Sequence, residues 1–412
     1  MPETTRGETS GGYRAVSVAL FLCLFAAQAA VIAMSPVLAD AAGDLHVSTA
    51  AAGQLRTITG LAAGITALAL GALAGRVGLG RQLLAASALL ALASIASAAA
   101  PTFPLLALAQ LPVGVAVAVL TTAGTLAAAE WVAPELRTRT LSWALVGQPA
   151  AWIVGMPLIG ALGERSWRFG WLALPLAAAV AAALVVASRA GQPPGSSRPA
   201  RARAVLADRA LARWLASELF ANAAWAGTLV YAGALFAESY GTSSKLTGCL
   251  LAVAAVAYVA GNVICRRLAR HDPRRILVLL ALLLAITDGL FGAVRPGIAA
   301  STALFASAAF VAGGRTLVAS AFALATAPEI RPAVTGLRAA TMQFGYFAGS
   351  IAGGTALTVG GYGALGAAIA GLFLGAAVTL ARQPATHGST AEPDSTLSRP
   401  RALLPALYRT RG

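Results

Sequence analysis

Hydrophobic residues along this chain form long uninterrupted runs that short polar stretches separate. The runs are about 18 to 27 residues long, close to the ~20 residues that a helix needs to cross a ~30 Å hydrocarbon layer. Core strands of soluble proteins are much shorter. The pattern predicts an all-α integral membrane protein with twelve transmembrane helices. The predicted spans lie near 15–37, 49–74, 83–100, 104–127, 140–162, 169–188, 211–236, 246–265, 276–294, 299–325, 333–357 and 361–381.

The composition agrees with a membrane protein. Hydrophobic residues make up 58% of the chain and charged residues 11%, against about 45–50% and about 25% in soluble domains. The net charge of +15 raises the alternative of nucleic-acid binding. That function needs basic residues clustered on one solvated face, whereas here they are dispersed among loops. We therefore expect no nucleic-acid partner.

The basic residues also predict the orientation of the spans. If the N-terminus is cytoplasmic, the tails and the loops on its side hold most of the 30 basic residues. Cytoplasmic loops are enriched in Lys and Arg, so we predict that both termini are cytoplasmic. The scarcity of lysine is typical of a GC-rich bacterial genome, which predicts a bacterial plasma membrane. We assign Arg165, Arg168, Lys245 and Arg295 to the opposite loops, and Arg56 and Arg315 to the spans.

The start of the chain has a competing interpretation. Arg14, the apolar run after it and the triplet 39–41 together resemble a signal peptide with its cleavage site. The run is about 23 residues long, which exceeds the 7–15 residues of a signal core. We therefore predict that it is retained as the first transmembrane helix.

A polar segment divides the chain near its middle. Residues 191–209, GQPPGSSRPARARAVLADR, are rich in Pro, Gly, Ser and Arg and are typical of a solvated linker. The predicted organisation is a cytoplasmic tail over 1–14, a six-helix half over 15–188, a cytoplasmic linker over 189–210, a second six-helix half over 211–381 and a disordered cytoplasmic tail over 382–412.

Two short motifs recur in both halves. APELR at 133–137 returns as APEIR at 327–331, and the Gly71-x4-Arg76 pattern returns from Gly261 to Arg266. Both pairs lie at the cytoplasmic ends of corresponding spans, and their offsets nearly agree. The chain is therefore predicted to be a duplication of a six-helix unit.

A parallel duplication of six helices resembles the major facilitator architecture, whose substrate site lies between the halves near the middle of the membrane. The segment GALAGRVGLGRQ at 71–82 resembles that family's loop signature between helices two and three. Gly71, Arg76, Gly78 and Arg81 match the signature, whereas Gly75 stands where the family has Asp.

A second resemblance is to the drug and sugar efflux branch of that family. GQPAAWIVGMPLIG at 147–160 resembles the antiporter signature in helix five, with Gly155, Pro157 and Gly160 in place and Met156 as a departure. Gln110 stands where these exporters have an arginine associated with proton coupling. The resemblance covers about residues 14 to 382. The chain resembles arabinose efflux permeases at further positions, which are Trp167-Arg168, Tyr231 and Gly261-Asn262.

The resemblance implies a secondary active transporter that exports a small organic molecule by alternating access, in exchange for protons. Import or uniport of a small metabolite is the alternative within the family. We expect the partners to be the substrate, the lipid bilayer and, as a candidate coupling ion, the proton, and we expect a monomer.

Proteins of another class fit less well. An intramembrane enzyme needs a nucleophile, metal ligands or paired carboxylates at membrane depth, and none is evident. His46, His271 and His387 fall in predicted loops or the tail, and no phosphate-binding loop occurs. We expect no enzyme activity, no cofactor and no metal. A channel is disfavoured by the duplicated halves and the helix-five glycines.

The resemblance places helices one, four, seven and ten around the central cavity. In helix seven, Glu218, Asn222 and Trp225 recur at i, i+4 and i+7, and Thr228 and Tyr231 continue the stripe, which predicts one polar face. Polar atoms without partners in lipid cost several kcal/mol, so this face meets water, ligand or another helix of the same half. Further candidates for the cavity are Gln28, Gln110, Gln148 and Gln343.

Four charged residues within the predicted spans are candidates for a role at membrane depth. Arg315 lies ten residues up helix ten and Glu218 about seven residues up helix seven, so at ~1.5 Å per residue their depths differ by only ~5 Å. We predict that the two pair, either as an exchangeable contact in the cavity or as a permanent structural pair. Arg56 is expected to extend to the membrane interface, and Asp288 in helix nine to be a structural partner.

Overall fold

The computed structural model describes residues 4–72, 76–189, 202–327 and 330–381, and within these residues the chain is helical and contains no strand. The long helices of the first half are α1 (Thr4–Ile32), α4 (Leu55–Ala72), α5 (Leu79–Ala99), α6 (Phe103–Glu130), α7 (Arg137–Gly163) and the composite of α8 (Phe169–Trp171), η2 (Leu172–Leu176) and α9 (Ala177–Ala187). Those of the second half are α11 (Arg209–Tyr240), α12 (Ser244–Ile264), α13 (Pro273–Ala293), α14 (Ile298–Leu324) and α15 (Arg331–Ala381). The short elements are α2 (Leu38–Asp44), α3 (Thr49–Gly53), η1 (Pro134–Leu136), α10 (Ala202–Ala207) and η3 (Cys265–Arg270).

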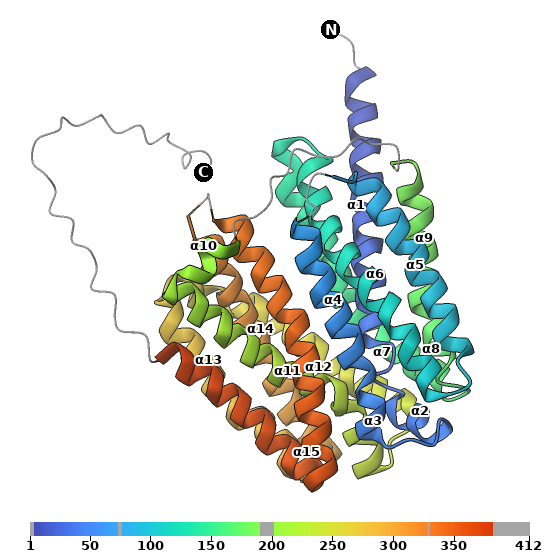
Figure 1. Ribbon diagram of the computed structural model, residues 1–412, viewed down its shortest axis with the longest axis vertical. Helices are drawn as coiled ribbons and strands as arrows, with labels where there is room; N and C mark the ends of the chain where they lie inside the picture. The colour runs from blue at the N-terminus through green and yellow to red at the C-terminus, as the bar shows by residue number, and fades with distance from the viewer. Residues whose placement is uncertain (1–3, 73–75, 190–201, 328–329, 382–412) are drawn as a thin grey trace, which may run out of the picture.

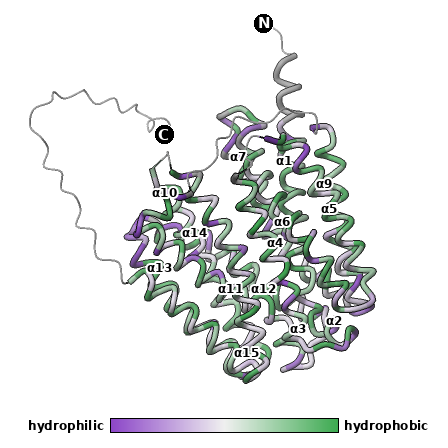
Figure 2. Tube along the Cα trace, viewed as in Figure 1, coloured by the Kyte–Doolittle hydropathy of each residue, from purple (hydrophilic) through white to green (hydrophobic). Residues whose placement is uncertain are grey.

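Ten helices of the described residues are long and apolar enough to cross a membrane. One of them, α15, is two helices joined at Gly360 and Gly361, and Gly361 has a φ of 62° that favours glycine. In addition, α4 has 18 residues and carries one charge. Each of the twelve predicted spans therefore has a helical counterpart, which confirms the all-α membrane fold. Figure 2 shows apolar residues along the helices and hydrophilic ones mostly at their ends.

The helix boundaries differ from the prediction near the first two spans. The first predicted span ran to 37, but α1 ends at Ile32 and residues 33–37 form turns. Pro36 explains this end, because proline lacks an N–H and restricts the residue before it. The second predicted span is broken at Gln54 into α3 and α4. Gln54 uses its side chain to donate to the Ser350 carbonyl at 2.9 Å, in the other half.

The predicted linker and tails are described only in part. Residues 190–201 and 382–412 lie outside the described residues, so the structure does not test the predicted disordered tail. The end of the predicted linker is the short helix α10, and α1 begins within the predicted tail 1–14. Asp208 then caps α11 by accepting from the backbone N–H groups of Ala210 and Leu211.

The two halves meet at the end of the bundle away from α10 and diverge toward the end where α10 lies (Figure 1). Across this contact α7 packs against α12, and α4 packs against α15. Glycines permit the close approach. A Cβ atom at Gly160 would lie 2.2 Å from the Ser244 carbonyl oxygen, and one at Gly248 would lie 2.3 Å from the Met156 carbonyl oxygen.

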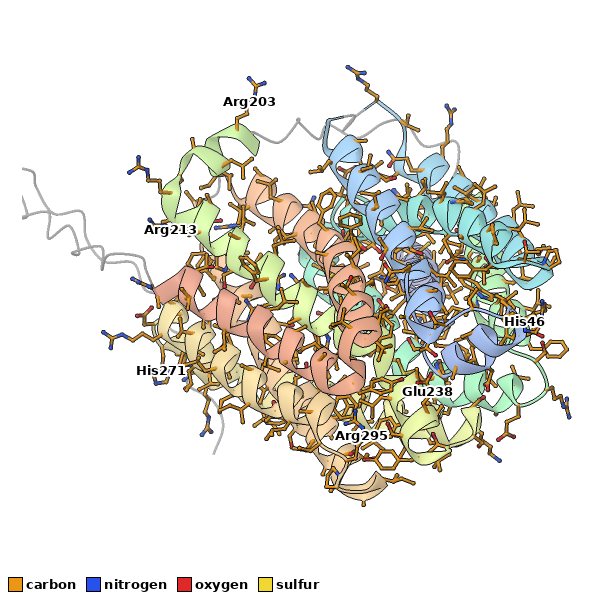
Figure 3. The ribbon with its side chains drawn as sticks, turned by 60° about the horizontal axis from the view of Figure 1, so that its bottom comes forward. His46, Arg203, Arg213, Glu238, His271 and Arg295 are labelled. Atoms are coloured by element: carbon orange, nitrogen blue, oxygen red, sulfur yellow. The ribbon has the colours of Figure 1, made fainter. Side chains whose placement is uncertain are left out.

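Hydroxyl groups and carboxylates join the halves at the same end, which we call the closed end. Figure 3 shows Glu238 and Arg295 there, away from Arg203 on α10. In each of three contacts a carboxylate accepts from a hydroxyl of the other half. The pairs are Asp40 with Ser244, Glu164 with Ser243 and Glu238 with Thr49.

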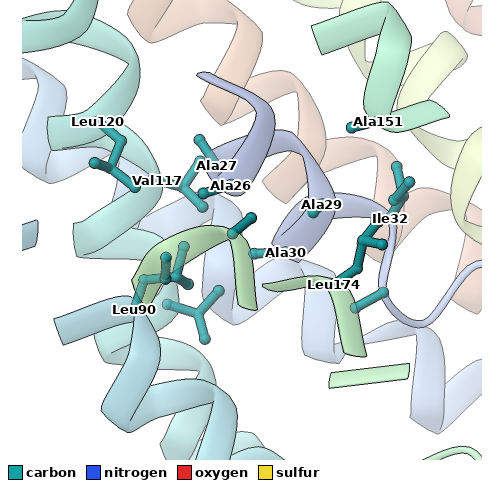
Figure 4. Packing of buried hydrophobic residues seen from close by; sticks show 14 of the residues in the cluster. Ala26, Ala27, Ala29, Ala30, Ile32, Leu90, Val117, Leu120, Ala151 and Leu174 are labelled. Carbon is teal, nitrogen blue, oxygen red and sulfur yellow. The ribbon is translucent and has the colours of Figure 1, made fainter. Parts of the chain in front are cut away.

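Alanines pack the interior of the first half closely. Ala26, Ala27, Ala29 and Ala30 of α1 are buried against the surrounding helices (Figure 4). Small residues let helix backbones approach, which matters in a membrane because lipid provides no hydrophobic drive for helix association. This packing fixes α1 beside α6 and α7.

Candidate functional site

A carboxylate and two guanidinium groups form a buried cluster between α11, α14 and α15, and we call it the charge cluster. An oxygen of Glu218, Oε1, lies 2.8 Å from Arg315 Nη2, and the other, Oε2, lies 3.0 Å from Arg338 Nε. The exposed side-chain fractions are 1% for Glu218, 7% for Arg315 and 24% for Arg338. The predicted pairing of Glu218 with Arg315 is thus confirmed.

The two contacts of Glu218 differ in geometry. Arg338 donates an aligned hydrogen bond from Nε to Glu218 Oε2, and it also donates to the Thr316 carbonyl at 3.4 Å. Arg315 is equally close, yet its Nε and Nη2 atoms and Glu218 Oε1 have no hydrogen-bond partner. The Arg315 contact is therefore mainly Coulombic, and its Nε atom is left without an acceptor.

Arg338 was not among the predicted residues of the site. The prediction that only Arg56 and Arg315 are the basic residues within spans is wrong, because Arg338 lies inside α15, which begins at Arg331. The predicted span 333–357 already contained this residue, so the sequence did indicate that it lies within the membrane. It was overlooked because it was counted among the arginines of the loops.

An aromatic stack connects the two halves beside the charge cluster. The Trp152 ring of α7 lies 6.3 Å from the Tyr258 ring of α12, and Tyr258 lies 6.2 Å from Trp225 of α11. Trp225 continues the stack to Phe305 at 6.2 Å. Tyr258 also donates a hydrogen bond of 2.9 Å to the Thr316 hydroxyl. Trp225 was a predicted candidate, whereas Trp152 and Tyr258 were not, because neither belongs to a polar stripe.

The predicted polar stripe of helix seven does not form one face. Asn222 packs against Gly345 of α15, where a Cβ atom would lie 2.5 Å from the Asn222 Cβ. Thr228 turns instead toward α13 and donates to Asp288 Oδ2 at 2.7 Å, as expected of a structural partner. Tyr231 donates to the Ser350 carbonyl at 3.1 Å. The stripe drifts around the helix because steps of three residues fall short of a full turn.

The four candidate glutamines lie in different places. Gln110 bonds within the first half: it accepts from Thr59 at 3.3 Å and donates to Ser97 at 3.2 Å. Gln343 is buried in α15, and its Oε1 atom has no partner. Gln28 of α1 and Gln148 of α7 are half-buried. In the described part of the chain, no hydrogen bond joins any two of these four residues.

The position of the Arg56 side chain differs from the prediction. It was expected to extend to the interface, but it is 9% exposed, and its Cζ lies 4.0 Å from the centre of the Tyr346 ring in the other half. The reason is its position in the first turn of α4, at the contact with α15. A cation over an aromatic ring is attracted by the ring's electrons.

The residues that match the loop signature at 71–82 and the helix-five signature at 147–160 lie at helix ends and at packing contacts. Gly71 lies near the end of α4 and Gly78 precedes α5, with Arg76 and Arg81 exposed beside them. Gly75 lies outside the described residues. In helix five, Gly155 packs on Leu174, Pro157 lies inside α7, and Gly160 contacts α12.

Trp167 and Arg168, which precede α8, form hydrogen bonds with the end of α2 rather than lining a site. Both donate to the Asp44 carboxylate, Trp167 through its indole N–H at 2.9 Å. These two donors hold the pKa of the Asp44 carboxyl below its ordinary value. Asp44 is largely exposed and lies in a polar hollow with Asp40 and Glu164, outside the spans.

This contact predicts a small acid-dependent loss of stability. Because the folded-state pKa of Asp44 is depressed, the contact stabilises the fold above the unfolded pKa of about 3.9 and is lost as the pH falls through the folded-state value. Melting temperatures of the wild type and Asp44→Ala should therefore differ slightly at pH 7 and converge below about pH 4. Arg168→Gln should show the same convergence. A difference that stays constant down to pH 3 would contradict this role.

No group of three or more His, Cys, Asp or Glu residues in the described part of the chain could hold a metal ion. The charge cluster and the aromatic stack beside it consist of arginines, one carboxylate and aromatic rings. Such groups suit binding and release of an organic molecule.

Comparison with solved structures identifies the fold. The nucleoside transporter NupG has a TM-score of 0.72 at 14% identity, over 90% of this chain and 98% of that one. The human organic anion transporter MFSD10 (TETRAN) has a TM-score of 0.63 at 17% identity, over 89% and 99%. A bacterial homologue of the human lysosomal transporter Spinster, in an inward-facing and unoccupied conformation, has a TM-score of 0.67 at 14% identity, over 90% and 95%. These identities show a shared fold.

No curated protein matches the chain. The sequence model of the Major Facilitator Superfamily, however, matches residues 20–236 and again residues 215–411. The matched family points to a transporter rather than an enzyme. The chain belongs to the Major Facilitator Superfamily, and it is a multi-pass membrane protein that acts as a secondary transporter.

Proposed function

We propose that this transporter exports a small organic molecule from a bacterial cytoplasm by alternating access, while protons enter in exchange. The observation that supports it best is the charge cluster, in which one buried carboxylate holds two cations from two different helices. A carboxylate that loses its cations in a buried site takes up a proton. Glu218 can therefore alternate between ion pairing and protonation.

The unequal contacts of Glu218 suggest the order of events. Arg315 can leave Glu218 while Arg338 keeps its hydrogen bond, so the N–H groups of Arg315 become available to a bound substrate. Separation of α15 from α11 would then release Arg338 and let Glu218 take a proton. Trp152, Trp225 and Tyr258 provide aromatic surface for the apolar part of the substrate.

The basic residues of the loops support cytoplasmic termini, and the efflux-type residues of helix five support the outward direction. With that orientation, the described conformation is closed on the outer side. The proposed partners are the substrate, the bilayer and protons, and the proposed unit is a monomer. The solved relatives are a nucleoside transporter and an organic anion transporter by their titles, so the fold leaves the substrate class open.

The test begins with purified protein and a thermal-shift screen of nucleosides, sugars, organic anions and lipophilic cations, because a ligand of the folded state raises its stability. The best binder is then followed in proteoliposomes with an imposed pH gradient. Substrate should move against the direction of proton flow. Glu218→Gln should lose the dependence on the gradient, while Glu135→Gln, at an exposed position in η1, should keep it.

Two outcomes would reject parts of the proposal. Flux that is indifferent to the pH gradient would reject proton exchange. Movement of substrate and protons in the same direction would reject export and favour import of a metabolite.

A further inference from the structure

Arg56 is a buried cation that lacks a carboxylate partner. Its Nε and Nη2 atoms have no hydrogen-bond acceptor, and no carboxylate in the described part of the chain lies within ion-pair distance of it. Tyr346 contacts the guanidinium with the face of its ring, 4.0 Å from the Cζ atom. A buried charge normally has a paired counter-charge as well as hydrogen bonds. Arg56 thus has unused binding capacity.

The unused N–H groups border a cavity. Arg56 lines a hollow of about 40 Å³ together with Thr59, Gln110 and Trp171. Trp171 is 1% exposed, and its indole N–H also lacks an acceptor. None of the residues that line the hollow is acidic. The volume exceeds the ~10–15 Å³ that one water molecule needs.

Two kinds of occupant could satisfy these donors. A water molecule could accept one or two of the hydrogen bonds, but it would leave the charge of Arg56 without compensation. An anion would accept the hydrogen bonds and neutralise the charge together. The small volume restricts such an anion to a halide or to a small carboxylate such as acetate.

We propose that the cavity beside Arg56 is a binding site for a small monovalent anion, with Arg56 and Trp171 as its main hydrogen-bond donors. The shared chemistry is a compact negative charge, which either a free halide or a small free carboxylate supplies. This site was not among the predicted substrate residues, and most of its lining residues belong to the first half, apart from the charge cluster.

The walls of the cavity come from both halves. Val230 of α11 lines it, and Tyr346 of α15 covers the guanidinium. The site is therefore complete only when the halves meet at the closed end, so a bound anion favours this conformation. Binding can be measured without any transport, which keeps this proposal separable from the proposed export.

The experiment compares sodium bromide and sodium acetate with sodium gluconate, whose anion is too bulky for the cavity, at constant ionic strength. With purified protein, bromide or acetate should raise the melting temperature by a few degrees in a saturable way. Equilibrium dialysis should find one bromide per chain. Competition by acetate would identify a carboxylate site, and binding of bromide alone would identify a halide site.

Matched variants assign the effect to the cavity. Arg56→Gln should abolish the anion-dependent rise in melting temperature, and in gluconate it should be at least as stable as the wild type, because an uncompensated buried charge is gone. Trp171→Phe should weaken binding roughly tenfold, since it removes one N–H donor to a charged group. Arg76→Gln, at an exposed arginine of the same half, should change nothing.

Two results would overturn the proposal: neither anion raises the melting temperature above that in gluconate, or Arg56→Gln binds bromide as the wild type does. If Arg56→Gln does not fold, Arg56→Lys and Trp171→Phe decide. Both should bind more weakly than the wild type, and unchanged affinity in both would overturn it equally.

Discussion

Glu218→Ala should destabilise the protein more than the alanine substitution of either arginine that contacts it. Without the carboxylate, Arg315 and Arg338 remain buried or half-buried with no counter-charge. Removal of one partner from a buried ion pair costs about 3–5 kcal/mol. Arg315→Ala is milder, because Glu218 keeps its hydrogen bond to Arg338. Thermal unfolding of the purified variants provides the measurement.

The control for this series is Glu135→Ala, which removes an exposed carboxylate. A melting temperature of Glu218→Ala at or above that of Arg315→Ala would show that the charge cluster does not depend on its carboxylate. The double exchange Glu218→Arg with Arg315→Glu, which would suit an isolated pair, should not restore stability, because Arg338 would then face a like charge. Stability and transport at wild-type levels in that double variant would assign no role to Arg338.

Gly248→Leu should abolish transport while the helices still form. A Cβ atom at this position would lie 2.3 Å from the Met156 carbonyl oxygen and 3.1 Å from Pro157 Cα. The larger side chain therefore separates α12 from α7 and prevents contact of the halves at the closed end. Overpacking costs about 1–3 kcal/mol, and each 1.4 kcal/mol shifts a conformational equilibrium about tenfold. Flux in proteoliposomes, with circular dichroism as a check on helix content, measures the effect.

The matched control is Gly371→Leu, because Gly371 lies in α15 with no atom near its Cβ position. It should transport and unfold as the wild type does. Normal flux in Gly248→Leu would mean that the contact between α7 and α12 is not part of the working cycle.

The helices could be predicted from the sequence because each apolar run must be about as long as the membrane is thick. The local breaks could not. Pro36 ends α1 and Gln54 separates α3 from α4 inside runs that remain apolar on average. The average hydrophobicity along the chain does not reveal the missing N–H of Pro36. Nor does it reveal that the Gln54 side chain forms a hydrogen bond with the other half.

The candidate site could be predicted only where the depth of a residue in the membrane was sufficient to identify its partner. Glu218 and Arg315 pair because the two helices place them at similar depths, which residue counting captures. Arg56 at Tyr346, and Trp152 at Tyr258, depend on which helix faces which across the halves. Helix periodicity within one span contains no information about that pairing. Thr228 shows the same limit, since its partner Asp288 lies on a third helix.

The charge cluster also has a consequence for biosynthesis. Glu218 precedes Arg338 by 120 residues, and Arg315 too is made after it. During synthesis α11 therefore reaches the translocon with its carboxylate before either cation exists. A lone charge in a membrane helix costs about 2.5–3.5 kcal/mol even on insertion scales. We therefore expect α11 either to stay at the edge of the lipid or to insert with Glu218 protonated. Its stable insertion then requires α14 and α15, which carry Arg315 and Arg338 and are synthesised later.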